Sequence, residues 1–310
     1  MTRAILRTLA VAVIAPTLML TSCVQPTPQE DPQETATPTT DEPLPPEPNP
    51  LIAVKVDNVA AARPQTGIGD AHIVIVEPVE AGLTRLLAVF EAPLPEVVGP
   101  VRSARITDLD LLRLLGEPTF AYSGAANEVL DRFRDAPLIN ATEGNTPGAF
   151  FRDNRRSSPH NLYVRPGLLP QPSEPPAGAV LAVGESPLGG EITTGERVDY
   201  GLASYAITWD SDKSAWTIDV DSRPLSTTDS GNIVADTVVL QEVDIRPGLL
   251  GSPEARTTGS GAVTVLRDGE RHVGQWRRTR SEDPLLFFTS AGEPLTVAEG
   301  TTWIFLVPSA

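Results

Sequence analysis

Short apolar runs separated by turn-rich polar segments dominate the chain from residue 51 to about residue 165. Runs rich in β-branched residues predict buried strands, and they cover residues 51–56, 73–76, 83–91 and 119–122. Two other segments carry apolar residues at helical spacing, which predicts helices over about 105–115 and 126–133. Because strands alternate with helices, residues 51–165 are expected to form a domain of the α/β class, a mixed sheet with helices.

Beyond residue 197 the pattern changes to the alternation that is typical of half-buried strands. Strand candidates cover residues 205–209, 216–220, 237–240, 262–267, 270–276, 285–289 and 303–307. Asp268 and Gly269 separate two of them and suit a type I′ turn, which predicts a hairpin. Residues 197–310 are therefore expected to form a smaller β-rich C-terminal domain. The frequent proline and glycine over residues 166–196 predict a linker between the two domains.

Residues 1–22 have the organisation of an export signal, in which Arg3 and Arg7 precede an apolar stretch too short to span a membrane. Residues 20–23 read Leu-Thr-Ser-Cys and resemble the bacterial lipobox, where the chain is cut before a cysteine that then carries lipid. Cys23 is the only cysteine of the chain, so an ordinary signal peptide with a chance cysteine is the less favoured alternative.

The segment after Cys23 is rich in proline, threonine and acidic residues and contains no lysine or arginine up to residue 50. Such a composition cannot build a core, and its prolines favour an extended backbone. Residues 23–50 are therefore predicted to be the lipidated cysteine and a disordered tether. This tether would hold the folded part at the outer face of the cytoplasmic membrane.

The chain is strongly acidic, with 24 Lys+Arg against 40 Asp+Glu and a formal net charge of −16. A nucleic-acid binder is expected to be basic, so no nucleic-acid partner is predicted. Phosphate-loop and dinucleotide-binding fingerprints are absent from the sequence, and its three histidines lie far apart. We therefore expect no cofactor and no metal.

Residues 99–105, Gly-Pro-Val-Arg-Ser-Ala-Arg, combine a Gly-Pro breaker with two arginines just before a predicted helix. A helix N-terminus presents free N–H groups and a partial positive charge. Arg102 and Arg105 beside it would complete an anion site for a carboxylate or a phosphate. The alternative is that both arginines form ion pairs that only hold the loop.

Acidic residues follow two of the predicted strands, because Asp57 ends the first and Glu77 ends the second, with Glu80 shortly after. Polar groups at strand ends commonly form sites in open sheets. The alternative is that these acids pair with arginines, for which the candidates are Arg63, Arg85, Arg102 and Arg105.

A nucleophile is a further candidate, with Ser103 or Ser123 as the hydroxyl and His160 as the base. Ser123 precedes a predicted helix, so capping of that helix is its favoured role.

Many of these residues lie in motifs that follow one another in order: Asp57-Asn58; Ala62-Arg63-Pro64-Gln65 with Gly67; Glu77 to Arg85; Gly99 to Arg105; and Pro159-His160-Asn161-Leu162-Tyr163. This series resembles the YerB-like family of bacterial lipoproteins over most of residues 51–164. The resemblance implies an exported, membrane-anchored envelope protein with two domains, and it supplies no catalytic residue. The chain departs from the family pattern at residues 80–82, where a Gly-Gly pair is usual, and at residues 122–124, where a histidine-containing segment is expected.

The sequence thus favours a non-catalytic binding or scaffold module of the bacterial cell envelope, with an arginine-rich anion site in the N-terminal domain. The ligand-binding candidates are Asp57, Asn58, Arg63, Gln65, Glu77, Glu80, Arg85, Arg102, Ser103, Arg105, His160 and Asn161. The expected partners are the membrane, through the lipid anchor, and a cell-wall polymer or wall-assembly proteins. The alternative is a hydrolase of envelope polymers that uses His160 or the acids Asp57, Glu77 and Glu80.

Overall fold

The structure, a computed structural model, describes residues 50–176 and 178–309, and these belong to one compact unit. The predicted export signal and tether, Cys23 included, lie outside the described residues. In the part that is described, no helix has the length and apolar character needed to cross a membrane.

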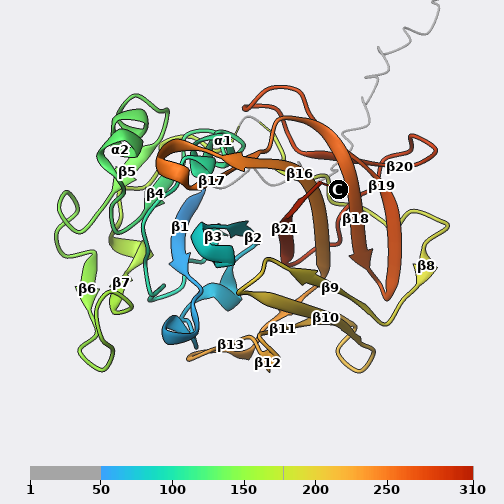
Figure 1. The fold of residues 1–310 in the computed structure, drawn as a ribbon, viewed down its shortest axis with the longest axis horizontal. Helices are drawn as coiled ribbons and strands as arrows, with labels where there is room; N and C mark the ends of the chain where they lie inside the picture. Colours follow the sequence, from blue (N-terminus) through green and yellow to red (C-terminus); the bar gives the residue numbers. More distant parts are fainter. Residues whose placement is uncertain (1–49, 177, 310) are drawn as a thin grey trace, which may run out of the picture. The chain divides into compact units, whose positions relative to one another are not determined.

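A 12-stranded mixed sheet forms the centre of the fold (Figure 1). From edge to edge its main path consists of β20 (Leu286–Thr289), β19 (Glu270–Arg278), β18 (Gly259–Arg267), β16 (Thr237–Pro247), β21 (Thr302–Pro308), β2 (Ile73–Pro78), β3 (Thr84–Phe90), β1 (Ile52–Asp57), β4 (Thr119–Ala121) and β5 (Ile139–Ala141). Two more strands join beside this path, because β17 (Pro253–Arg256) pairs with β16 and β8 (Glu191–Ile192) pairs with β19.

The two halves of the chain meet within this sheet. Strand β2 pairs in parallel with β21, with Ile73 opposite Thr302 and Val76 opposite Phe305. Strand β21 pairs in parallel with β16 on its other side. Strands from residues 51–165 and from residues 197–310 therefore share one ladder of backbone hydrogen bonds.

The remaining strands of the described residues form three smaller sheets (Figure 1). A 5-stranded sheet contains β12 (Arg223–Pro224), β11 (Ala215–Val220), β10 (Ser204–Asp210), β9 (Gly195–Asp199) and β15 (Val234–Ala235). Two strand pairs consist of β13 (Ser226–Thr227) with β14 (Gly231–Asn232), and β6 (Phe150–Arg152) with β7 (Leu162–Val164).

The core divides along the two faces of the large sheet, because successive side chains of a strand point to opposite faces. On one face, Val54 and Val56 of β1 belong to the same buried cluster as Tyr205 and Trp216 of the 5-stranded sheet. On the other face, Ala53 of β1 belongs to a cluster with the helical residues described next. Every residue of β1 is buried, as expected for a strand covered on both faces.

Two short helices, α1 (Thr107–Arg113) and α2 (Asn127–Arg134), lie at the places where the sequence predicts them. They pack Leu111, Leu112, Val129 and Phe133 against the sheet. The helices contain only 7 and 8 residues, and long C-terminal strands join the same sheet. The predicted α/β class therefore overestimates the helix content. The fold is β-rich and is built on a large mixed sheet.

The hairpin predicted at residues 262–276 is confirmed, with β18 and β19 antiparallel over their whole length. Asp268 and Gly269 both have positive φ, 53° and 77°, as a type I′ turn requires. The predicted linker, residues 166–196, also contributes to the packing, because Leu181 bridges to Leu285 and Val183 to Val297.

Candidate functional site

The candidate site begins with a row of charged residues across three adjacent strands. Strands β1 and β2 both pair antiparallel with β3, so their carboxyl ends lie at the same edge. Arg85 of β3 is opposite Asp57 on one side and Glu77 on the other. Residues directly opposite each other in a sheet point to the same face, so the pairing brings these three predicted side chains together.

The loop of residues 99–105 is fixed beside this row by backbone hydrogen bonds. The N–H of Asp57 donates to Pro100 O at 2.9 Å, and the N–H of Arg102 donates to Lys55 O at 2.8 Å. The loop therefore runs along the end of β1 and places Arg102 beside Asp57.

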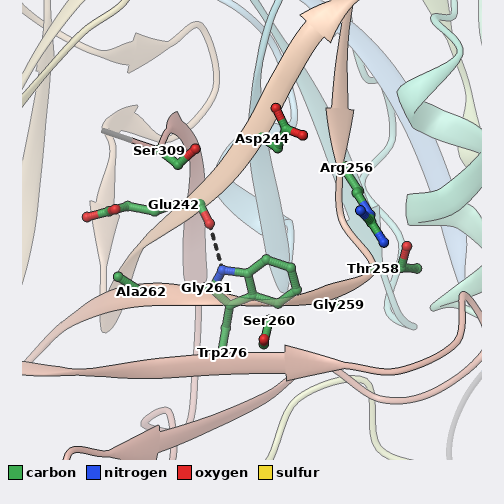
Figure 2. Close-up of a pocket in the computed structure, with 10 residues that line it drawn as sticks. All are labelled: Glu242, Asp244, Arg256, Thr258, Gly259, Ser260, Gly261, Ala262, Trp276 and Ser309. Carbon is green, nitrogen blue, oxygen red and sulfur yellow. Dashed lines mark hydrogen bonds between the residues drawn. The ribbon is translucent and has the colours of Figure 1, made fainter.

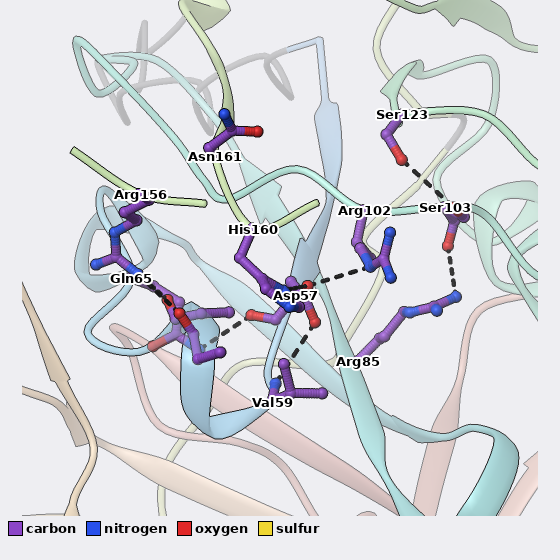
Figure 3. Close-up of polar contacts among 12 residues, drawn as sticks. Asp57, Val59, Gln65, Arg85, Arg102, Ser103, Ser123, Arg156, His160 and Asn161 are labelled. Atoms are coloured by element: carbon purple, nitrogen blue, oxygen red, sulfur yellow. Dashed lines mark hydrogen bonds and ion pairs between the residues drawn. The ribbon is translucent and has the colours of Figure 1, made fainter. Parts of the chain in front are cut away.

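Asp57 is the centre of the contacts drawn in Figure 3. Its side chain is 1% exposed, and one of its oxygens, Oδ2, lies 3.1 Å from Arg102 Nε and 2.8 Å from His160 Nδ1. An ionised carboxylate only accepts hydrogen bonds, so Nδ1 of His160 carries the proton in this contact. A neutral His160 then has Nε2 free to act as an acceptor.

Glu80 and Arg105 form a two-point ion pair at the rim of the site. Arg105 Nε donates to Oε1 and Nη2 donates to Oε2, both at 2.8 Å, and Ser252 Oγ donates to Oε1 at 2.7 Å. Burial alone would raise the pKa of Glu80, but the hydrogen bonds from Arg105 and Ser252 outweigh it and lower the pKa to about 2. The charge of Arg105 is thereby balanced.

Arg85 differs from the other arginines of the site. It is 8% exposed, and Nη1 donates to the carbonyl oxygen of Ser103 at 2.9 Å. Among the described residues no carboxylate lies within ion-pair distance of its guanidinium, whereas Arg102 and Arg105 each have one. Burial, followed by the like charges of Arg105 and Arg102, lowers the pKa of Arg85 to about 10.

Glu77 faces a buried cation that the sequence interpretation missed. Lys55 Nζ lies 2.5 Å from Glu77 Oε1 and 2.7 Å from Asp108 Oδ1, and all three side chains are at most 1% exposed. Burial and the neighbouring charge of Asp108 raise the pKa of Glu77 to about 8. The signal that could have revealed this cluster is a lysine that stands between two valines within a buried strand.

Four predicted residues, Asn58, Arg63, Gln65 and Asn161, do not contact the Asp57 carboxylate, although Gln65 Nε2 donates to the backbone oxygen of Asp57 at 3.2 Å. Asn58 donates to Thr84 and Tyr205 and accepts from Gln65 at 2.8 Å, in the interior beneath the sheet. Arg63 pairs with Asp221 at 2.7 Å. Asn161 accepts from Arg152 at 3.0 Å, and Figure 3 shows its amide turned away from Asp57.

Two expectations about helix ends are corrected by the structure. Ser123 does not cap α2, because the helix begins at Asn127 after Ala126 and its N-cap has no side-chain hydrogen bond. Ser123 Oγ instead lies 3.4 Å from Ser103 Oγ. The N–H of Arg105 donates to Asp108 Oδ2 at 2.6 Å, so a carboxylate already occupies the N-terminal end of α1. A bound anion would therefore have to contact the arginines rather than that helix end.

A cavity of about 300 Å³ lies beside the loop that carries Ser103 and Arg105. Its lining residues are Glu80, Ser103, Ala104, Arg105, Gly124, Ala125, Ala126, Val129, Leu249, Leu250 and Ser252. Three of the predicted site residues, Glu80, Ser103 and Arg105, therefore line one cavity. Arg85 does not line it, but its guanidinium donates a hydrogen bond to the backbone carbonyl of Ser103.

A second hollow of about 370 Å³ lies over strands β16 and β18 (Figure 2). Its charged lining residues are Glu242, Asp244 and Arg256, and the indole N–H of Trp276 donates to Glu242 O at 2.7 Å. None of the predicted site residues lines this hollow.

Comparison with known proteins identifies two domain families in the chain. Residues 35–174 match the family described as "Protein of unknown function (DUF3048) N-terminal domain". Residues 197–304 match the corresponding "C-terminal domain".

A relative and a solved structure agree with these matches. The chain is 26% identical over 275 residues to a Bacillus subtilis (strain 168) protein named "Putative lipoprotein YerB", covering 83% of this chain and 81% of the relative. The crystal structure of YerB from Bacillus subtilis superimposes with a TM-score of 0.74 at 22% identity. That likeness covers 85% of this chain and 92% of the other, and it shows that the two share a fold.

Proposed function

Because the chain belongs to the DUF3048 family and has a relative with the name "Putative lipoprotein YerB", we propose that it is a membrane-anchored binding module of the bacterial cell envelope. Its ligand is an anionic group that binds at Arg85. The observation that carries this proposal is that Arg85, which is 8% exposed, has no carboxylate partner among the described residues.

The charges around Arg85 favour the entry of an anion. Three guanidinium groups, of Arg85, Arg102 and Arg105, face two carboxylates, of Asp57 and Glu80, so one positive charge is in excess when His160 is neutral. A buried charge without a partner is unfavourable, and an anion that reaches it forms charge-assisted hydrogen bonds. This local excess of positive charge lies in a chain whose net charge is −16.

An envelope ligand with such a group is an anionic glycan or peptide of the cell wall, or an acidic segment of a wall-assembly protein. Arginine suits this role because its planar donors match both carboxylate and phosphate oxygens. Asp57 and Glu80 would orient Arg102 and Arg105 around the ligand, since each accepts from one of them.

Arg85→Met should abolish binding of anionic wall fragments while changing the free energy of unfolding by no more than about 1 kcal/mol. The substitution removes a buried unpaired charge, which offsets the loss of one hydrogen bond to Ser103. Titration of muropeptides into the purified protein measures binding, and urea denaturation measures stability.

Arg113→Met is the matched control, since it removes the same charge from an exposed position at the end of α1. It should leave both binding and stability unchanged. Muropeptide binding that survives Arg85→Met would remove Arg85 from the site. A loss of several kcal/mol in that variant would assign Arg85 a structural role instead.

The anchor rests on the lipobox-like residues and on the lipoprotein relative. Cys23→Ala should release the protein from membranes or leave the precursor uncut, because the acylated side chain and the cleavage position are both lost. Membrane fractionation and gel mobility of the expressed full chain measure the outcome. A variant that fractionates and migrates like the wild type would contradict the anchor.

One observation favours a second candidate function, a hydrolase of envelope polymers. Asp57 accepts a hydrogen bond from Nδ1 of His160, and such a contact would orient the ring if His160 acted as a general base. Among the hydrogen bonds of the described residues, however, none joins the His160 ring to a serine or threonine hydroxyl. Release of smaller products from muropeptides or wall polymer during the binding assay would favour the hydrolase.

A further inference from the structure

Lys55, Glu77 and Asp108 bring an amine and two carboxyl groups together in the interior, and the proposed anion site does not use them. Lys55 of β1 and Glu77 of β2 point to the sheet face that α1 covers. This follows because Ala53 and Ile75, two residues before them, belong to the same buried cluster as residues of that helix. Asp108 lies in the first turn of α1. All three side chains are at most 1% exposed, so they can react only with one another.

The amine of Lys55 lies close to the carboxyl group of Asp108. Its Nζ is 2.7 Å from Asp108 Oδ1 and 2.5 Å from Glu77 Oε1. The three groups are held by two strands of the sheet and by the helix packed on it, so they are brought together before any reaction begins. Desolvated lysine amines are among the nucleophiles that proteins use against carbonyl carbons. The arrangement therefore has the parts needed for an attack on Cγ of Asp108.

The second oxygen of Asp108 already faces a hydrogen-bond donor. The backbone N–H of Arg105 donates to Oδ2 at 2.6 Å. Attack on Cγ places negative charge on this oxygen, and an N–H group that is already in position stabilises such charge. Oδ1, which contacts Lys55, is then the oxygen that can leave as water.

Glu77 can move the protons that such a reaction requires. Burial, followed by the charge of Asp108, raises the pKa of Glu77 to about 8, so its carboxyl group keeps a proton at neutral pH. Oε1 contacts Lys55, while Oε2 has no hydrogen-bond partner among the described residues. A carboxyl group that holds a proton and has a free oxygen can donate to one group and accept from another.

We propose that Lys55 and Asp108 condense in the folded chain to an isopeptide bond, with Glu77 as the general acid and base. The bond between Nζ and Cγ forms, and the bond between Cγ and Oδ1 breaks. Two of the three protons of the Lys55 ammonium leave with Oδ1 as water, and the third stays on the amide nitrogen. Glu77 donates its proton to Oδ1 and regains one from Nζ, so it is unchanged at the end and no co-reactant is needed.

The bond would relieve the interior of charge and join two elements covalently. A neutral amide replaces a buried ion pair, whose desolvation is costly. The amide links β1 to α1, and a disulfide could not do so because Cys23 is the only cysteine of the chain. The bond does not depend on a ligand at the anion site.

The separate ion pair of the structure is the reactant of this step. Glu77 remains a buried carboxyl group after the bond forms, so its titration is kept. Replacement of Lys55 leaves the Asp108 carboxylate without its partner whether or not the bond forms in the wild type.

Trypsin digestion of the denatured full chain, followed by mass spectrometry, reveals the bond. Trypsin cuts after lysine and arginine, so an unlinked chain is cut after Lys55 and yields the free peptide of residues 106–113. The linked chain should lack this free peptide and contain it joined to the peptide that carries Lys55, with the mass of one water missing. Lys213 is the internal control, because it pairs with Asp210 at an exposed turn and should be cut normally.

Glu77→Gln tests the acid and base, since it keeps Lys55 and Asp108 but cannot relay a proton. In samples taken at equal times after expression begins, the free peptide of residues 106–113 should be at least roughly tenfold more abundant in this variant than in the wild type. Glu128→Gln, an exposed change in α2, is the matched control and should digest like the wild type. Equal linkage of Glu77→Gln and the wild type at every time would overturn the role of Glu77.

The wild-type digest decides on the bond itself, whether or not a variant folds. Absence of the free peptide, with the branched peptide in its place, is the expected result. Full yield of the free peptide and complete cleavage after Lys55, persisting when the folded protein is incubated for days, would overturn the isopeptide bond and leave a buried ion pair.

Discussion

Lys55→Met is expected to lower the free energy of unfolding by about 3–5 kcal/mol, the range measured when one partner of a buried ion pair is removed. Lys55 is fully buried in strand β1 and contacts the carboxyl groups of Glu77 and Asp108. Methionine has a similar shape, so the packing of the strand is largely kept. The loss arises because the Asp108 carboxylate then lies in the interior beside Glu77 without a cation, and urea denaturation at neutral pH measures it.

Lys213→Met is a matched control, because Lys213 is the other lysine of the chain and pairs with Asp210 at an exposed turn. It should change stability by less than about 0.5 kcal/mol. The triple variant Lys55→Met, Glu77→Gln, Asp108→Asn should recover much of the loss, since no stranded charge remains. A single Lys55→Met variant with the stability of the wild type would show that the cluster is not an ion-pair network.

Much of the strand and helix pattern follows from local sequence. The runs that become β1, β2 and β3 have few polar positions. Such runs are expected to form strands that are covered on both faces of a sheet, and these strands are. The turn at Asp268 and Gly269 is equally local, because few residues other than this pair readily adopt two successive positive φ angles. Such features depend on residues that are neighbours in the chain.

The parallel pairing of β2 with β21 could not be predicted in the same way. Ile73 and Thr302 lie opposite each other although the whole central part of the chain separates them. Apolar periodicity indicates that both segments are buried strands, but it contains no information on which strand is the neighbour of which. The β-rich character of the fold follows from this pairing, since it merges the strands of both halves into one sheet.

The site shows the same division between local and long-range information. Acids at strand ends and arginines in the loop of residues 99–105 were recognisable from the sequence, and the expectation that they pair with one another holds for Asp57 and Glu80. Which arginine is left without a carboxylate depends on the register of β1, β3 and the loop. The role of Lys55 was missed because its partner Asp108 comes from a helix 53 residues further along the chain.

Stability is expected to fall as the pH rises from about 5 to about 8, and Glu77 is the reason. Lys55 can neutralise only one of two buried carboxylates, and burial raises the pKa of Glu77 from 4.5 to about 8. Between these values folded Glu77 keeps a proton that the unfolded chain releases. The free energy of unfolding therefore decreases by as much as about 1.4 kcal/mol per pH unit from this group.

Glu77→Gln removes the titratable carboxyl group and with it this part of the pH dependence. The variant should have a flatter profile than the wild type in urea denaturation at several pH values, and the difference in stability should shift in its favour toward pH 8. Glu128→Gln is the control, because Glu128 is exposed in the first turn of α2, and its profile should follow that of the wild type. Equal slopes for wild type and Glu77→Gln would show that Glu77 is ionised in the folded protein, with Lys55 holding two charged carboxylates.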